Sequence, residues 1–199
     1  MIFRINPNTT MKFPCLRYTA ILTCFLCLFV PGGVHAEDAS LANIIVTNTR
    51  DDLLLYLTVK DAFPEKIEET IHSGVPATFS FLINLYAVRP LWLDRQIAEI
   101  KITHTIKYDN LTKKYSVIRS WEEENPHMVT NLEDAKKLMT EVDSLTIVAL
   151  NQLEKGKQYQ IRVKAELDKL TLPFYLHYIL FFVSAWDFET DWYTIDFIY

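Results

Sequence analysis

Apolar and polar residues alternate along much of the chain after residue 40, which predicts a protein built mainly from half-buried β-strands. The clearest strand is Gln158–Leu167, in which every second residue is apolar. Ile97–Tyr108 and Tyr115–Trp121 alternate in the same way, and the turn residues Asp109 and Asn110 lie between them. The sequence therefore predicts that these two segments pair as a hairpin.

Five further segments are rich in β-branched, aromatic or other apolar residues and are predicted as strands. They are Ala42–Asn48, Leu53–Lys60, Val75–Val88, Leu145–Leu150 and Asp191–Tyr199. Because the chain ends on the last of them, we expect that strand to be paired with a neighbour.

Two segments follow the helical period instead. In the first, Pro64 suits the opening position of a helix and Gly74 its end, with Ile67 and Ile71 on one apolar stripe. In the second, Asn131 suits the N-cap position. The buried stripe of that helix would consist of Leu132, Ala135, Leu138, Met139 and Val142.

These elements lack the regular alternation of strands and helices that a parallel sheet requires. We therefore expect a mainly β fold, an antiparallel β-sandwich of the immunoglobulin-like kind with two or three short helices. No repeat or flexible linker divides the chain, so residues 37–199 are predicted to form a single domain.

The first 36 residues have the features of a secretory signal peptide, with Met11 as an alternative start. Lys12 and Arg17 precede the apolar stretch Tyr18–Val30, and small residues then indicate cleavage after Ala36. The alternative is that the segment stays attached as an N-terminal anchor. The sequence predicts an exported protein in either case.

All three cysteines (Cys15, Cys24 and Cys27) lie in this segment. The exported chain would then have no disulfide, thiolate metal site or cysteine nucleophile. The formal net charge is −5 at pH 7, and it becomes −8 without the three basic residues of the first 36. Because an acidic chain repels nucleic acid, we expect no nucleic-acid partner.

The most apolar stretch outside the signal segment is Leu170–Trp186. It is at the short limit for a membrane-spanning helix and contains Pro173. It could instead be buried in the core. It could also contact a membrane surface or a partner protein, since Tyr and Trp favour interfaces where part of the side chain is buried and part is hydrated. On the last reading, the contact residues would be Phe174, Tyr175, Tyr178, Phe181, Phe182 and Trp186.

Signals for catalysis, cofactors and metals are weak. After residue 36 the chain has only two glycines, Gly74 and Gly156, too few for a glycine-rich phosphate loop. The histidines are dispersed, and His104 and His177 stand among apolar residues as structural histidines usually do. We therefore expect no catalytic residue, no cofactor and no metal ion.

Asp187, Glu189 and Asp191 occupy every second position and could share one face of a strand. Three such carboxylates could hold calcium or provide an acid pair, but Trp192 stands where a calcium loop needs glycine. The simpler interpretation is a polar corner between two apolar elements. The tryptophans could line a sugar or peptide groove, although Trp is more often core, and Trp121 is the one that we most expect to be exposed.

Three stretches carry a resemblance to a known family. The motifs within Asp61–Phe81, Lys107–Glu122 and Lys164–Tyr199 resemble those of a bacterial envelope family known only as domain of unknown function 4390. The resemblance implies an exported bacterial protein with a single β-rich domain. We expect its location to be the periplasm or the outer face of the inner membrane. It implies no activity, cofactor or site residue.

The expected function is a non-enzymatic envelope module that binds a partner protein or a membrane surface through the aromatic segment Pro173–Trp186. The alternative is a binding domain for a small hydrophobic or sugar ligand in an aromatic-lined pocket. An enzyme would require a cleft in which His104 or His177 reaches the Asp187–Asp191 carboxylates.

Overall fold

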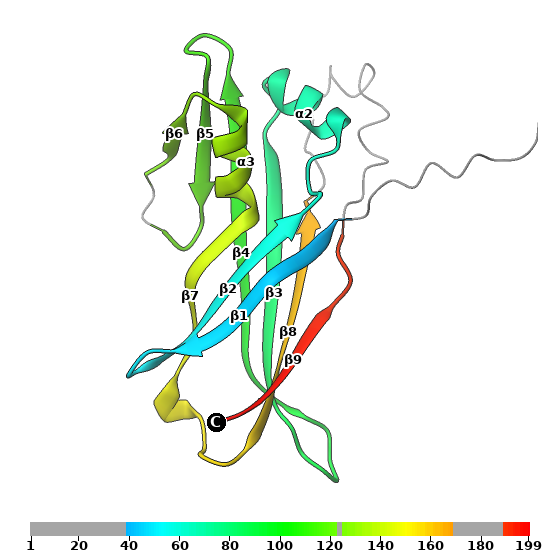
Figure 1. Cartoon of the computed structure of the whole chain (residues 1–199), viewed down its shortest axis with the longest axis vertical. Helices are drawn as coiled ribbons and strands as arrows, with labels where there is room; N and C mark the ends of the chain where they lie inside the picture. Colours follow the sequence, from blue (N-terminus) through cyan, green and yellow to red (C-terminus); the bar gives the residue numbers. More distant parts are fainter. Residues whose placement is uncertain (1–38, 123–124, 169–188) are drawn as a thin grey trace, which may run out of the picture. The chain divides into compact units, whose positions relative to one another are not determined.

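The computed structural model describes residues 39–122, 125–168 and 189–199, and all structural statements refer to these. Their strands form two antiparallel sheets (Figure 1). The small sheet has the order β1 (Ser40–Asn48), β2 (Asp52–Lys60), β7 (Glu141–Ala149). The large sheet has the order β6 (His127–Val129), β5 (Lys114–Arg119), β4 (Arg95–Asp109), β3 (Ala77–Ala87), β8 (Gln158–Leu167), β9 (Tyr193–Ile198). The predicted mainly β, sandwich-like antiparallel fold is confirmed.

The core lies where alternate residues of the two sheets face each other. On β3, Phe79, Phe81, Ile83 and Leu85 are buried to 1% exposure or less, as the alternation predicted. Leu55 and Leu57 of β2 belong to the same buried cluster. Apolar burial of this kind is the dominant favourable term in folding, and it holds the two sheets together.

Both predicted helices are present. The helix α2 (Glu65–His72) follows Pro64 and buries Ile67 and Ile71. The helix α3 (Leu132–Thr140) begins at Asn131, whose side chain accepts a hydrogen bond from the backbone N–H of Glu133 (3.1 Å). A short 3₁₀ helix, η1 (Leu150–Gln152), follows β7.

The end of α3 differs from the prediction. The backbone is already extended at Glu141, so Val142 is buried from β7 and not from the helix. The strand β7 is also longer than the predicted Leu145–Leu150, because Ser144 has a positive φ of 55° and breaks the alternation. The three-residue strand β6 is too short to show any period.

The last strand is paired, as expected. β9 runs antiparallel to β8, with Ile195 opposite Ile161 and Phe197 opposite Tyr159. The predicted hairpin between Ile97–Tyr108 and Tyr115–Trp121 is confirmed as β4 and β5. No helix within the described residues is long and apolar enough to cross a bilayer.

Candidate functional site

The loop between β3 and β4, residues Val88–Asp94, is the most unusual surface of the described domain, and we call it the tip loop. It turns over Arg89–Trp92, where the Trp92 N–H donates to the Arg89 carbonyl (3.4 Å) and Pro90 occupies the second turn position. Proline is favoured there because its fixed φ matches the turn. The Val88 N–H still bonds to Gln158 at the start of β8 (3.0 Å), so the residues beyond it project past the sheet (Figure 1).

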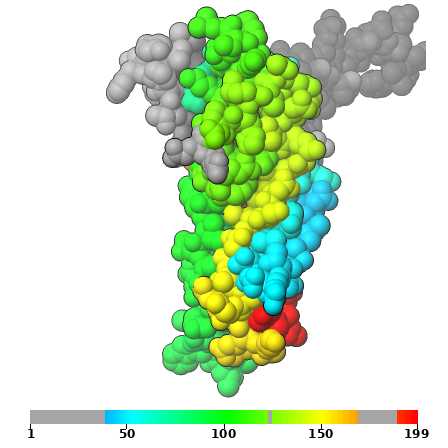
Figure 2. Space-filling model, turned by 90° about the vertical axis from the view of Figure 1, so that its left-hand side faces the viewer, coloured from blue at the N-terminus to red at the C-terminus, as the bar shows by residue number. Residues whose placement is uncertain are grey.

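Three consecutive large apolar residues occupy the tip loop. Leu91 is 96% exposed, Trp92 76% and Leu93 83%. Single exposed apolar residues are common on protein surfaces, but contiguous exposed apolar groups indicate a binding surface. In the space-filling view the loop, in green, forms a projection at the lower end of the domain (Figure 2).

The charges around the tip loop are mainly positive. Arg89 and Arg95 flank the apolar residues on either side and are exposed. The Asp94 carboxylate accepts a hydrogen bond from the Arg89 backbone N–H (3.2 Å) and lies 3.9 Å from the Arg162 guanidinium. Asp94 is thus partly compensated within the domain, and Arg95 helps to lower the pKa of Glu154.

The predicted contact residues lie outside the described residues. They are Phe174, Tyr175, Tyr178, Phe181, Phe182 and Trp186. The prediction that Pro173–Trp186 forms a contact surface therefore stays a prediction. His177 and Asp187 also lie outside the described residues.

Part of the predicted acid cluster is described. The Glu189 carboxylate bonds to the Lys164 ammonium (2.8 Å), and Glu189 forms an isolated bridge with Glu166. Asp191 is exposed. No group of three potential metal ligands occurs among the residues that the structure describes.

His104 is a buried core residue, in agreement with the interpretation from its strand position. Its Nδ1 lies 2.7 Å from the Met139 carbonyl oxygen, so Nδ1 carries the proton and donates it. Nε2 is buried without a hydrogen-bond partner among the described residues. Burial lowers the pKa of His104 to about 4, while the hydrogen bond to Met139 opposes this shift.

A polar network closes the surface beside His104. The Arg119 guanidinium donates to the Leu138 carbonyl (3.0 Å) and to one Glu122 oxygen (2.8 Å). The other Glu122 oxygen bonds to His127 Nε2 (2.5 Å). Burial raises the pKa of Glu122, but the bonds from Arg119 and His127 outweigh it and hold that pKa below its usual value. The network joins β5 to the end of α3.

The expectation that Trp121 is exposed is wrong. Its ring is partly buried and lies 4.5 Å from the His104 ring, and the Arg119 guanidinium lies 5.7 Å from its centroid. Among the described tryptophans the most exposed is Trp92 in the tip loop, at 76%. The sequence signal for it was the apolar run Leu91–Leu93 directly after Pro90, where the strand ends.

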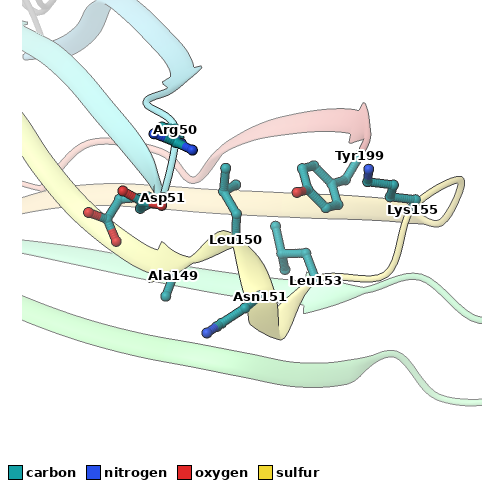
Figure 3. A pocket seen from close by; sticks show the side chains of 9 residues that line it. Arg50, Asp51, Ala149, Leu150, Asn151, Leu153, Lys155 and Tyr199 are labelled. Carbon is teal, nitrogen blue, oxygen red and sulfur yellow. The ribbon is translucent and has the colours of Figure 1, made fainter.

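Two hollows lie near the C-terminus. One, of about 410 Å³, is an open hollow lined by the β1–β2 turn, η1 and Tyr199, with Arg50 and Lys155 at its sides (Figure 3). The other, of about 330 Å³, is a groove between β1 and β9 with mainly apolar walls. Its residues include Ile44, Val46, Leu53, Tyr193, Ile195, Phe197 and Tyr199.

Comparison with known proteins gives one family. No curated protein matches the chain, and no solved structure does so. One family model, described as Domain of unknown function (DUF4390), matches residues 36–196 and so spans most of the chain. The chain belongs to this family.

Proposed function

We propose that the protein is an exported, non-enzymatic module of the bacterial envelope that attaches to a membrane surface through its tip loop. The observation that carries the proposal is the run Leu91–Leu93, three large apolar side chains that are each more than three-quarters exposed. The signal-like segment 1–36 supports export, and the family resemblance supports an envelope location.

The composition of the tip loop matches the chemistry of a bilayer interface. Tryptophan concentrates at the headgroup level because its ring is apolar and its indole N–H can stay hydrated. Burying a leucine side chain contributes about 1.5–3 kcal/mol, so Leu91 and Leu93 would contribute favourably on partial insertion. Arg89 and Arg95 would each add about 1 kcal/mol near an anionic leaflet.

The groove between β1 and β9 favours a second candidate function. Tyr193, Phe197 and Tyr199 line it together with aliphatic residues of β1, as a site for a small hydrophobic ligand would require. This function would not use the tip loop, so the two proposals respond to different substitutions.

Replacing Leu91, Trp92 and Leu93 together by Ser is expected to lower the partition coefficient for anionic vesicles at least about tenfold, since most of the inserting apolar surface is lost. The measurement is co-sedimentation with phosphatidylglycerol-containing vesicles. Leu111→Ser is the matched control, because Leu111 is a 94% exposed apolar residue on the β4–β5 turn. This control should bind as the unchanged protein does.

Unchanged binding of the triple variant would contradict the proposal. A Phe181→Ser/Phe182→Ser variant distinguishes the alternative contact within Pro173–Trp186. Loss of binding in that variant alone, with the fold intact by circular dichroism, would place the contact there.

A further inference from the structure

The sheet edges of the described domain differ in how well they are protected against pairing with another chain. The strand β6 is only three residues long. β1 has an irregular register between Ala42 and Ile45, and Asn43 has a positive φ of 51°. β7 has two register shifts against β2 and a positive φ at Ser144. Short strands and bulges are the usual means of blocking edge-to-edge association.

Among the residues that the structure describes, the edge strand β9 has none of these protections. Its six residues, Tyr193–Ile198, pair with β8 in one continuous register and include no Pro, Lys or Arg. Its one charged residue, Asp196, accepts a hydrogen bond from Gln160 on the neighbouring strand (3.0 Å). Trp192 is 47% exposed and Ile198 74%. An exposed, regular and apolar edge of this kind is a template for another strand.

The backbone groups that β9 leaves open can be identified. The Tyr199 N–H donates to the Lys157 carbonyl (3.1 Å), so the odd-numbered residues bond to β8. In an antiparallel ladder the bonding direction alternates from residue to residue. Thr194, Asp196 and Ile198 therefore direct their N–H and C=O groups toward the open edge.

We propose that the occupant of this edge is the β9 strand of a second copy of the chain, paired antiparallel around a twofold axis at Ile195. This register places Thr194 opposite Asp196 of the second copy and Trp192 opposite Ile198. On the inner face, Tyr193 lies opposite Phe197 and Ile195 opposite itself. Each pair is apolar with apolar or hydroxyl with carboxylate, and such cross-strand pairs stabilise a sheet.

The neighbouring registers are less favourable. A twofold axis at Asp196 would place two carboxylates directly opposite each other, which is destabilising. An axis at Thr194 would pair the exposed Trp192 with Asp196. An axis between two residues is excluded, because it would place an even-numbered residue opposite an odd-numbered one, whose N–H and C=O groups bond to β8. Of the axes at Thr194, Ile195 and Asp196, the sequence of β9 therefore favours the one at Ile195.

Antiparallel pairing would join two large sheets into one. Because it reverses the strand direction, the tip loops of the two copies lie at opposite ends and stay free for membrane contact. The shared edge is short, and small interfaces give weak, concentration-dependent association. We therefore expect a reversible dimer with a dissociation constant in the micromolar range.

Sedimentation equilibrium of the full chain over a concentration series tests the dimer. The mass should rise from monomer to dimer, and Ile198→Lys should raise the dimer dissociation constant at least about tenfold. Leu111→Lys, on an exposed turn away from β9, should leave association unchanged. A monomer at every concentration, or a dimer that Ile198→Lys does not weaken, would overturn the proposal.

Disulfide trapping tests the register itself. In a full chain carrying Cys15→Ala, Cys24→Ala and Cys27→Ala, a single cysteine is introduced at residue 194, 195 or 196. Directly opposed residues of a non-hydrogen-bonded pair are close enough for a disulfide. Ile195→Cys should give a cross-linked dimer after mild oxidation, and Thr194→Cys and Asp196→Cys should not. Preferential cross-linking at residue 194 or 196, or at none of the three, would overturn the proposed register.

Discussion

Phe81→Ala is expected to lower the free energy of unfolding by about 3–5 kcal/mol, the usual loss for an aromatic residue removed from a core. Phe81 is 0% exposed, and its ring lies 4.7 Å from the His104 ring. On the backbone it is paired with Ile102 of β4 on one side and Ala165 of β8 on the other. The cavity would therefore open at the centre of the large sheet, where its walls cannot collapse easily.

Chemical denaturation followed by circular dichroism measures this loss. Leu82→Ala is the matched control, because Leu82 is the next residue of β3, faces away from the core and is only partly buried. It should cost about 1 kcal/mol, in line with removal of a half-buried side chain. Equal losses for the two variants would contradict the assignment of the β3 faces.

Acid is expected to destabilise the domain through His104. Its pKa is lowered to about 4 in the folded protein from 6.5, chiefly by burial. The unfolded chain then binds one more proton between these values, so stability is full above pH 6.5 and falls as the pH is lowered. The fall should be about 1.4 kcal/mol per pH unit in this window and about 3 kcal/mol in total.

The comparison that isolates this effect uses the unfolding free energy of His104→Gln between pH 7 and pH 4. Glutamine can still donate to the Met139 carbonyl but does not titrate, so the variant should lose the slope contributed by His104. His72→Gln is the control, because His72 is exposed and its contacts among the described residues are with Tyr108 and Tyr115. If the unfolding free energies of the unchanged protein and His104→Gln depended on pH in the same way, the pKa of His104 would not be lowered by folding, which would contradict the prediction.

The regular parts of the fold could be predicted because burial alternates along them. In β3 and β8 every second residue faces the core, so the sequence alone shows both the strand and its buried face. The same reasoning failed at β7, where Ser144 interrupts the alternation and the strand begins directly after α3. The spacing of apolar residues does not show where the helix ends and the strand begins at such a junction.

The exposure of the tip loop could be inferred only in part. Pro90 indicates the end of a strand, but whether the apolar run Leu91–Leu93 then folds back onto the core depends on the length of the hairpin. In the structure β3 and β4 pair as far as Ala87 and Arg95, which leaves these residues beyond the core. Trp121 shows the opposite case, because it follows a strand but packs on His104, a contact set by tertiary structure.

The residues whose substitution should lower stability and the residues of the tip loop lie in separate parts of the molecule. Phe81 and His104 lie in the core, whereas Leu91–Leu93 contact solvent. Substitutions in the tip loop should therefore change membrane binding without lowering stability, as distant and independent sites usually behave.

The most direct test of the account is whether the Trp92 ring enters a bilayer. The measurement is the fluorescence of the full chain on phosphatidylglycerol vesicles with and without brominated acyl chains, compared with that of Trp92→Phe. A blue-shifted emission and bromine quenching are expected for the unchanged protein, and Trp92→Phe should lose both. Emission from Trp92 that stays unshifted and unquenched at saturating vesicle concentration would contradict the account.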